Sequence, residues 1–371
     1  MATIEQISKL AGCSSATVSR TINNSATVSL KTREAVMKAI AQTQYLVQRT
    51  GRRGRPPTLL KGRGTRLVEV LFSRNHPMER MSVNKGGLTI DAPQMWDSSK
   101  AFTSQYRISA SFYLKIVDAA VHELSDRGYR TVMQSTNDLG SADTLAEVNR
   151  PDRDGVLLIG EYCPALGDFV KNCVHPLVLV DLIIPSKADV VTTDNQVGIS
   201  KAFEHLYSLG HRKIGFAGKL DSVQGFVERY VTFKWKMAEF GLPVNPLWVY
   251  EGLNGIVETE QGVRKILAQR NRPTALVCVN DCAALGAIRA ASGLDVRIPE
   301  QLSVVGFDDE EASSLVTPAL TTVRTPVVEI GIQSARQIIL QIEHPQLVRT
   351  NGCCVRLTPD LVVRESTARC A

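Results

Sequence analysis

Residues Thr3–Asn23 read Thr-Ile-Glu-Gln-Ile-Ser-Lys-Leu-Ala-Gly-Cys-Ser-Ser-Ala-Thr-Val-Ser-Arg-Thr-Ile-Asn. This stretch predicts two short helices joined by a tight turn, and so decides the fold of the N-terminal part of the chain. Thr3 can cap the first helix, with Gln6 at the third helical position as in a capping box. Gly12 can end the same helix, because glycine readily takes the backbone conformation that a C-terminal cap needs.

The apolar residues of this stretch repeat at helical spacing. Ile4, Ile7 and Leu10 predict one apolar stripe along the first helix. Ser14 can cap a second helix, in which Val18 faces inward. A third helix, which Ser29 can cap, carries its apolar residues at Val36, Met37, Ile40 and Tyr45.

Two short helices across a glycine-containing turn form a helix-turn-helix, whose second helix lies in the major groove of DNA with its first residues at the base edges. The second helix is expected from Ser15 to about Ile22. The residues at or just beyond it that point outward are mostly small or able to hydrogen-bond: Ser15, Ala16, Thr17, Ser19, Arg20 and Asn23.

The charge distribution favours a nucleic-acid partner for this part of the chain. Residues 1–66 hold twelve Lys and Arg against two acids, a net charge of +10, whereas the whole chain carries +6, so residues 67–371 carry −4. A basic head on a mildly acidic body is typical of a DNA-binding module joined to a part that binds something else. A solvated basic tail is the alternative interpretation.

Residues Thr3–Asn23, the later Val28-Ser-Leu-Lys-Thr-Arg-Glu-Ala-Val36 and Tyr45 together resemble the DNA-binding head of the LacI/GalR repressors. On that resemblance, Ser15 and Ala16 occupy the positions that vary with operator sequence. Plain helix surface is the alternative interpretation of these two positions.

The same resemblance implies base reading by Arg20, whose fork suits guanine. It implies phosphate contacts for Thr17, Ser19 and Asn23, and such contacts position the protein without specifying a sequence. The residues of the head therefore divide into base-reading and phosphate-binding candidates.

The linker, residues 48–66, departs from the family, which usually has a short hinge helix there. It holds seven basic residues, four glycines and two prolines, and the glycines and prolines oppose a helix. Arg53-Gly-Arg-Pro56 resembles the core of an AT-hook, which lies in a narrow A·T-rich minor groove; such a groove attracts Arg53 and Arg55. A flexible basic linker with only nonspecific phosphate affinity is the alternative, and Leu59 or Leu60 could still act as a minor-groove wedge.

From residue 67 onward, apolar runs alternate with helical patterns. This alternation predicts an α/β fold with parallel sheets covered on both faces. Helices are expected near 111–127, 197–209, 226–240, 260–270, 281–291 and 327–342. The candidate strands are Leu67–Phe72, Thr131–Ser135, Val156–Ile159, Leu177–Val180, Lys213–Ala217, Ala275–Val279 and Leu302–Phe307.

The resemblance to LacI/GalR repressors continues in five further stretches. It implies a body with two periplasmic-binding-protein-like lobes and three chain crossings. The expected domains are the head, 1–47, the linker, 48–66, and the body, 67–371. Lobe 1 is expected at about 67–190 and 325–343, and lobe 2 at about 191–324 and 344–371. The stretches are Leu209–Gly218, Glu228–Phe233, Val279–Gly286, Val304–Asp309 and Thr317–Arg324.

Parallel sheets of this kind bind ligands at the carboxyl ends of their strands. The resemblance accordingly implies a small-molecule effector between the lobes, a sugar or a charged metabolite, with carbohydrate preferred. A structural salt bridge is the alternative for Arg229 and Asp308, and an N-terminal helix cap is the alternative for Asp281. The expected contacts are Asp181, Arg229, Asn280, Asp281, Asp308 and Phe112.

One segment does not fit the family. Residues 74–110 insert some thirty residues more than usual between the first strand and the first helix, which exceeds an ordinary loop. The insert holds enough apolar residues to bury surface. The sequence gives it no assigned role, and the first lobe is therefore the least well defined part of the resemblance.

Several classes of function find no support in the sequence. There is no nucleotide-binding glycine motif, no cysteine pair at zinc-site spacing and no nucleophile motif, so we expect no catalytic residues, no metal and no cofactor. No apolar run is long enough to cross a bilayer and no signal-peptide core is present, so we expect no membrane partner. Scattered cysteines indicate a reducing compartment, the cytoplasm, with the protein on the nucleoid.

These features predict a dimeric transcriptional regulator, and more specifically a repressor, whose affinity for a double-stranded DNA operator depends on a small molecule. One alternative is a small-molecule-binding protein or enzyme with an appended basic domain, which predicts turnover or function without the head. Another is an architectural protein of A·T-rich DNA, which predicts that deleting the body leaves DNA binding unchanged.

Overall fold

The computed structural model describes residues 4–22, 32, 35, 36, 39, 65–73, 81–84, 87–90, 104–160, 162–218, 224–252, 255–345 and 352–370. For residues 81–84, 87–90 and 104–110, and for a few in the head, it describes the backbone alone. The chain divides into two compact units, Met1–Arg63 and Gly64–Ala371, which are considered one at a time.

Among its described residues, the first unit has the helices α1 (Ile4–Ala11) and α2 (Ser15–Ile22) where the sequence predicts them. Gly12 ends α1 with a φ of +62°, in the left-handed region that glycine accepts readily. Ser14 begins α2, because its Oγ accepts a hydrogen bond of 3.2 Å from the backbone N–H of Thr17. The predicted cap at Thr3 lies outside the described residues.

The core of the head brings the three predicted helices together. Ile7 and Val18 are fully buried against Val36 and Ala39, both of which are helical. The prediction for Leu10 was wrong, because 58% of its surface is exposed. Leu10 lies three residues after Ile7, at the edge of the apolar stripe, where none of the described residues of the head buries it.

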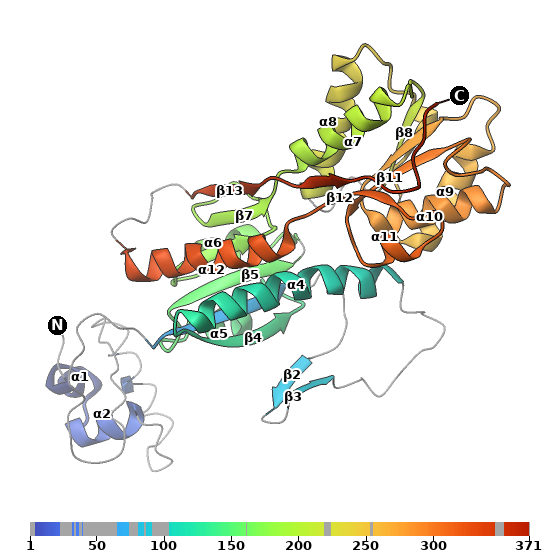
Figure 1. Ribbon diagram of the computed structural model, residues 1–371. Coiled ribbons are helices and arrows are strands. Elements are labelled where there is room, and N and C mark those ends of the chain that lie inside the picture. Colours follow the sequence, from blue (N-terminus) through green and yellow to red (C-terminus); the bar gives the residue numbers. More distant parts are fainter. Residues whose placement is uncertain are drawn as a thin grey trace. The chain divides into compact units, whose positions relative to one another are not determined.

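The second unit consists of two six-stranded sheets, each with helices on both faces (Figure 1). The first sheet has the strand order β13-β7-β6-β5-β1-β4, and all its neighbours are parallel. Its strands are β1 (Leu67–Ser73), β4 (Arg130–Thr136), β5 (Gly155–Gly160), β6 (Leu177–Val180), β7 (Asp189–Thr193) and β13 (Cys354–Leu357).

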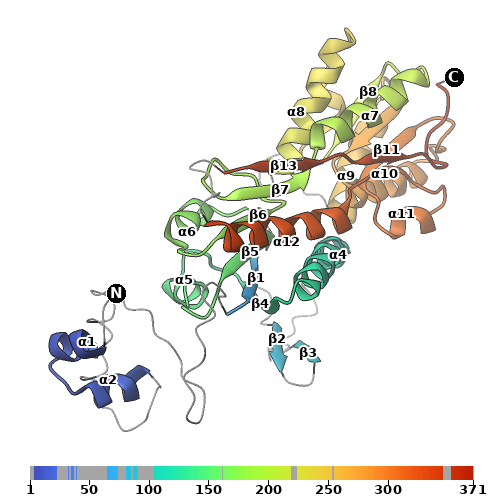
Figure 2. The same cartoon turned by 60° about the vertical axis from the view of Figure 1, so that its left-hand side comes forward.

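Figure 2 shows α5 (Ala142–Val148) and α6 (Leu166–Asn172) on one face of the first sheet, and α4 (Ser104–Asp126) and α12 (Val327–Glu343) on the other. All six residues of β5 are buried, as a central parallel strand requires. Helices α4 and α12 approach closely at Gly331, where a Cβ atom would overlap the carbonyl oxygen of Ile116.

The second sheet has the order β14-β12-β11-β10-β8-β9, with β14 antiparallel to β12 and the other pairs parallel. Helices α7 and α8 lie on one face and α9 and α10 on the other (Figure 1). The strands are β8 (Ile214–Ala217), β9 (Val249–Tyr250), β10 (Ala275–Cys278), β11 (Ser303–Asp308), β12 (Thr321–Arg324) and β14 (Asp360–Val362). The helices are α7 (Asn195–Ser208), α8 (Gln224–Glu239), η1 (Pro246–Trp248), α9 (Ile256–Leu267), α10 (Asp281–Ser292) and α11 (Ala312–Leu315).

We call the two sheets with their helices the first and second lobes. The chain crosses between them three times: between Thr193 and Asn195, between Arg324 and Val327, and between Leu357 and Asp360. The third crossing was expected near 344, and that prediction was wrong, because β13 still pairs with β7 of the first lobe. Its half-exposed edge position leaves only a weak apolar signal in the sequence.

The insert after β1 contains a hairpin of β2 (Met81–Asn84) and β3 (Gly87–Ile90), which form an antiparallel two-stranded sheet. Helix α4 begins at Ser104, seven residues earlier than the sequence predicted. Within the described parts of the chain, no helix is long and apolar enough to cross a membrane.

Candidate functional site

Charged and polar side chains gather at the carboxyl ends of strands in the second lobe. Strand β11 ends at Asp308, and β10 is followed by Asn280 and Asp281. Arg229, on α8, reaches the same place: its Nη2 lies 3.2 Å from Oδ1 of Asp308. The structure thus brings together four of the residues that the sequence singled out.

The guanidinium of Arg229 is held on several sides, although only 4% of the residue is exposed. Its Nη1 donates to the carbonyl oxygen of Val279 at 2.7 Å, and its Nε donates to Oδ1 of Asn195 at 2.8 Å. The ring of Phe307 lies beneath it, with 3.6 Å between Cζ and the ring centroid. These contacts and the ion pair with Asp308 use three of its five N–H groups, within the described part of the chain.

Asp308 has a strained backbone and a desolvated carboxyl group. Its backbone has a φ of +111°, which a non-glycine residue rarely adopts. Burial raises the pKa of Asp308 to about 7, and the neighbouring charge of Arg229 opposes that rise. Thr325, in the second crossing, donates a long hydrogen bond of 3.5 Å to its Oδ1. Strain and a raised pKa are features of functional sites.

Asp181 approaches this group from the first lobe. It follows β6 with a φ of +57°, and its Oδ1 accepts a hydrogen bond of 2.8 Å from Thr192. Burial raises the pKa of Asp181, while the positive charge of Arg229 lowers it. Arg229 is therefore close enough to Asp181 to interact electrostatically across the two lobes.

Asn280 and Asp281 lie at the expected strand end, but their hydrogen-bonding roles differ from those expected. Asn280, and not Asp281, caps α10, because its Oδ1 accepts a hydrogen bond of 2.9 Å from the N–H of Ala283. Both oxygens of Asp281 are engaged inside the lobe by the hydroxyl groups of Ser313 and Thr322 and by a backbone N–H. Only 1% of Asp281 is exposed. Its hydrogen bonds hold the loop after β11, so the structure argues against a direct ligand contact by Asp281.

Phe112 also lies in a different environment from the one the sequence suggested. It is 8% exposed and belongs to the apolar core between α4, α12 and the first sheet. Its neighbour Tyr113 meets it edge to face at 5.2 Å, and the hydroxyl of Tyr113 donates to the carbonyl oxygen of Gly160 at the end of β5. Tyr113, rather than Phe112, therefore reaches the strand ends of the first lobe.

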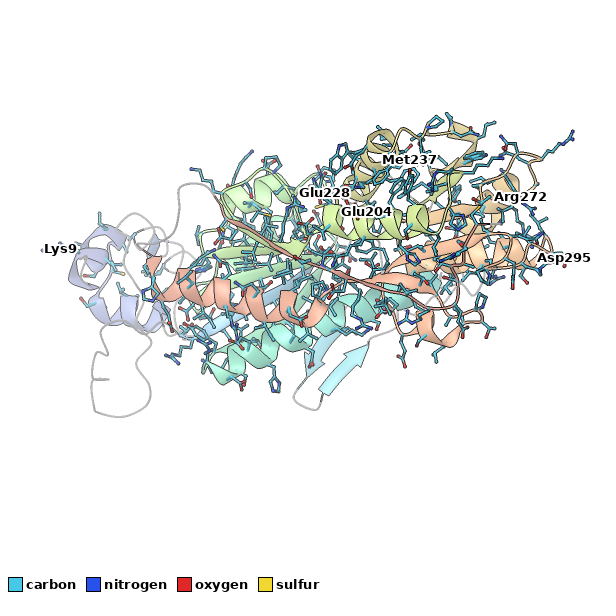
Figure 3. All side chains as sticks on the ribbon, turned by 45° about the horizontal axis from the view of Figure 1, so that its top comes forward. Lys9, Glu204, Glu228, Met237, Arg272 and Asp295 are labelled. Carbon is cyan, nitrogen blue, oxygen red and sulfur yellow. The ribbon has the colours of Figure 1, made fainter. Side chains whose placement is uncertain are left out.

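Two ion pairs join the lobes beside this group. Lys115 of α4 lies 3.8 Å from Glu310 of the loop after β11. Arg356 of β13 makes two hydrogen bonds, of 2.9 and 3.1 Å, to Glu228 of α8. Figure 3 shows Glu228 at the end of the second lobe nearest the first. Neither pair was predicted from the sequence, since the partners are far apart in the chain and lie on separate elements.

The candidate DNA-binding residues are only partly described. Ser15 is exposed at the start of α2, and Thr17 is half-buried with its hydroxyl 2.9 Å from that of Ser14. The backbones of Ala16, Ser19 and Arg20 are helical, in agreement with a recognition helix. Asn23, Arg53 and Arg55 lie outside the described residues.

No group of three or more His, Cys, Asp or Glu residues is placed to hold a metal ion in the described ranges. The site as described therefore consists of hydrogen-bonding side chains at strand ends. Such a set can bind a polar small molecule by complementary donors and acceptors.

Comparison with known proteins gives a consistent result for both units. Residues 3–48 match the bacterial regulatory proteins of the lacI family, and residues 203–367 match a periplasmic binding protein-like domain. The HTH-type transcriptional repressor PurR of Haemophilus influenzae (strain PittEE) is 29% identical over 371 residues, covering 99% of this chain and 98% of that protein. PurR of Pasteurella multocida (strain Pm70) is 29% identical over 372 residues, with the same coverage.

Solved structures show the same likeness over the full length. A complex of the transcriptional regulator CelR with cellobiose has 26% identity and a TM-score of 0.65, covering 99% of this chain and all of that one. The Lac repressor bound to ONPG in the repressed state has 25% identity and a TM-score of 0.61, covering 99% of both chains. Head and body therefore match regulators of one kind together, rather than as separate parts.

Proposed function

We propose how this chain binds and responds to its effector. The chain belongs to the LacI/GalR family and is a DNA-binding transcriptional regulator controlled by a small molecule. In this proposal Arg229, Asp308 and Asp181 contact the effector directly. Asn280 contacts the effector through its amide nitrogen, because its Oδ1 caps α10. The single observation that carries the proposal is the buried Arg229–Asp308 pair, held at strand ends and within electrostatic range of a carboxylate from the other lobe.

The charge of this set favours a neutral, hydroxyl-rich effector. Arg229, the cation of this set, is already paired with Asp308, so an anionic effector would meet no unpaired positive charge there. Sugar hydroxyl groups donate to carboxylates and accept from a guanidinium, and thereby satisfy both. The binding of cellobiose named for CelR agrees with this choice. We therefore propose a carbohydrate as the effector.

The proposed action is binding without turnover, and it links the lobes to the head. An effector between the lobes would favour one relative orientation of the two sheets, and the linker would pass this change to the head. One helix-turn-helix reads only a half-site, so we propose a homodimer on a pseudo-palindromic operator, acting as a repressor. Acting on the chromosome, it would work in the cytoplasm, associated with the nucleoid.

A thermal-shift screen of the full chain tests the choice of effector. The panel contains cellobiose, D-ribose, glucose and galactose, with amino acids and nucleosides as other chemical classes. A sugar present at a hundred times its Kd should stabilise the protein by about 2.7 kcal/mol through mass action. A hit among the amino acids or nucleosides alone would contradict the carbohydrate proposal. Chemical conversion of any hit by the protein would contradict binding without turnover.

A further inference from the structure

Each of the three crossings between the lobes contributes a residue that touches the Arg229–Asp308 pair or its neighbours. Asn195, which accepts from Nε of Arg229, is the first residue after the first crossing. Thr325, which donates to Asp308, lies within the second. Arg356 stands on β13 just before the third crossing and reaches the pair through intermediate residues. The candidate effector contacts are thus linked to every connection between the lobes.

The third link runs through four side chains, Arg356, Glu228, Asn195 and Arg229, which we call the Arg356–Arg229 chain. Nη2 and Nη1 of Arg356 donate to Oε1 and Oε2 of Glu228 at 2.9 and 3.1 Å. Oε2 of Glu228 also accepts from Nδ2 of Asn195 at 3.1 Å. Oδ1 of Asn195 accepts from Nε of Arg229 at 2.8 Å.

The chemistry of this chain fixes the orientation of its members. An ionised Glu228 only accepts hydrogen bonds, so Asn195 must turn its amide nitrogen toward it. The amide oxygen of Asn195 then faces Arg229, where it accepts the Nε proton. The opposite amide orientation would set two donors, the Asn195 nitrogen and the Arg229 Nε, against each other. The direction of every hydrogen bond in the chain therefore follows from the charge of Glu228.

Arg356 in turn holds Glu228 in place. The two parallel hydrogen bonds of a bidentate arginine–carboxylate pair restrict rotation of the carboxylate, which a single contact would not do. The side chain of Glu228 is only 13% exposed, and that of Arg356 is 32% exposed. The hydrogen bonds with Glu228 are the main cause that raises the pKa of Arg356. Arg356 is thus a partly buried cation whose hydrogen bonds, among the described residues, go to Glu228.

We propose that Arg356 is a positioning residue, which holds the guanidinium of Arg229 in its effector-binding orientation through Glu228 and Asn195. Arg356 belongs to the first lobe and Glu228 to the second, so the chain is complete only when the lobes have the relative orientation described here. This makes Arg356 a link between lobe orientation and effector affinity. The effector-binding part of the inference rests on the proposed function, whereas the positioning of Arg229 does not.

Hydrogen exchange at arginine side chains tests the positioning directly and needs no effector. The full chain is labelled with 15N-arginine, and the exchange rate of the Nε proton of Arg229 is followed by NMR. In the wild-type protein this proton is buried and bonded to Asn195, so it should exchange slowly. In Arg356→Met its exchange should be faster by about tenfold or more, since the acceptor is free to turn. Arg356→Lys, which keeps the charge but not the bidentate contact, should be intermediate.

Two controls separate this effect from general loosening. The Nε proton of Arg153, bonded to Glu69 in the core of the first lobe, should keep its exchange rate in every variant. Arg336→Met removes an exposed arginine–glutamate pair with Glu123 and should leave the Arg229 proton unchanged. If Arg356→Met loosens Arg153 as well, Glu228→Leu decides, because it removes the acceptor of Asn195 in the second lobe and leaves the first lobe, to which Arg153 belongs, unchanged.

Slow exchange of the Arg229 Nε proton in Arg356→Met, with Arg153 still protected, would overturn the inference. Where Glu228→Leu decides, slow exchange of that proton in Glu228→Leu would overturn it. Failure of the proposed function gives a different result. In that case Arg229→Ala would bind a sugar identified in the screen as tightly as the wild-type protein does, whatever the exchange rates. Fast exchange in Arg356→Met with weaker binding of that sugar would support both.

Discussion

Nη2 of Arg229 lies 3.2 Å from Oδ1 of Asp308, at the point where two strands of the second lobe end. Both residues also contact the chain where it passes between the lobes, Arg229 through Asn195 and Asp308 through Thr325. A molecule that bound this pair would therefore act beside two of the three crossings between the lobes. In the function proposed above, this placement connects effector binding to control of DNA binding.

Removing one partner of the buried Glu69–Arg153 pair is predicted to destabilise the protein more than removing both. Nε of Arg153 donates to Oε2 of Glu69 at 2.9 Å, and the other Glu69 oxygen has no hydrogen-bond partner among the described residues. Arg153→Met should lower the free energy of unfolding by about 3–5 kcal/mol, because it leaves a buried carboxylate unpaired. Urea titration of the full chain measures this change.

The double variant Glu69→Leu, Arg153→Met should regain most of that loss, because no buried charge is left alone. Arg336→Met, which removes an exposed pair with Glu123, should cost no more than about 1 kcal/mol. A double variant as unstable as Arg153→Met alone would show that desolvation of Glu69 is not the cause.

Glu310 is predicted to reduce stability as the pH rises toward neutrality. Burial is the main cause that raises its pKa from the usual 4.5 to about 7. The charge of Asp308 also raises this pKa, and the charge of Lys115 lowers it. The folded protein binds this proton more tightly than the unfolded chain does. The contribution of the proton to the free energy of unfolding is therefore fully present below about pH 4.5. It is lost as the pH rises through 7.

Comparison of the wild-type protein with Glu310→Gln isolates this group, since Asp281 and Asp308 titrate in both. Between pH 5 and 7 the unfolding free energy should fall less steeply with pH in the variant than in the wild-type protein. The difference between the two slopes should be at most about 1.4 kcal/mol per pH unit, the limit for one proton. Asp360→Asn is the control, because hydrogen bonding by Lys201 lowers the pKa of Asp360 and its effect belongs to acid pH. Parallel curves for wild type and Glu310→Gln would refute the assignment.

The cap of the recognition helix is predicted to set the stability of the head. Ser14 accepts the N–H of Thr17, so Ser14→Ala should lower the stability of the head by about 1 kcal/mol. Hydrogen exchange of the α2 amides reports this loss, and those of β5 in the other unit serve as the internal control. Ser14→Asp keeps an acceptor and should retain the wild-type exchange. Unchanged α2 exchange in Ser14→Ala would mean that the cap contributes nothing.

The linker is predicted from its sequence to read the minor groove through Arg53 and Arg55. Replacing a central A·T step of a selected operator by G·C adds the guanine amino group to that groove, so affinity should fall. The double variant Arg53→Ala, Arg55→Ala should abolish this preference. A merely basic linker would instead lose affinity equally on both centres, with a salt slope smaller by about one unit per phosphate contact. Titrations at two salt concentrations distinguish these outcomes.

The sequence predicted the lobes well because their central strands are buried on both faces. Leu177–Val180 matches β6 residue for residue, and the runs at β5 and β11 differ from the structure by one residue at each end. Strands of mixed composition were missed: β13 is half-exposed, and the buried strands β7 and β12 carry polar residues that interrupt the apolar run. Apolar runs therefore identified most of the core strands, and the edge strand β4, but not the strands with polar residues.

The site was predictable only in part, for a similar reason. A residue that follows a buried strand can be located from the sequence, as Asp181 and Asp308 were. Whether its side chain then faces a ligand or the protein depends on partners that are distant in the chain, as with Ser313 and Thr322 around Asp281. The link from Arg356 to Arg229 needs three elements in place, β13, α7 and α8, which no local pattern reveals.

The central claim is that an effector acts on DNA binding through the Arg229–Asp308 pair. The most direct test is titration of an operator, selected from random DNA, with wild-type protein and with Asp308→Asn, each with and without a sugar identified in the screen. We predict a two-fold symmetric operator and equal affinity of both proteins without sugar. The sugar should change the operator affinity of the wild-type protein only, because loss of a charged hydrogen-bond partner costs effector binding about 1.5–3 kcal/mol. A full response to the sugar in Asp308→Asn would contradict the account.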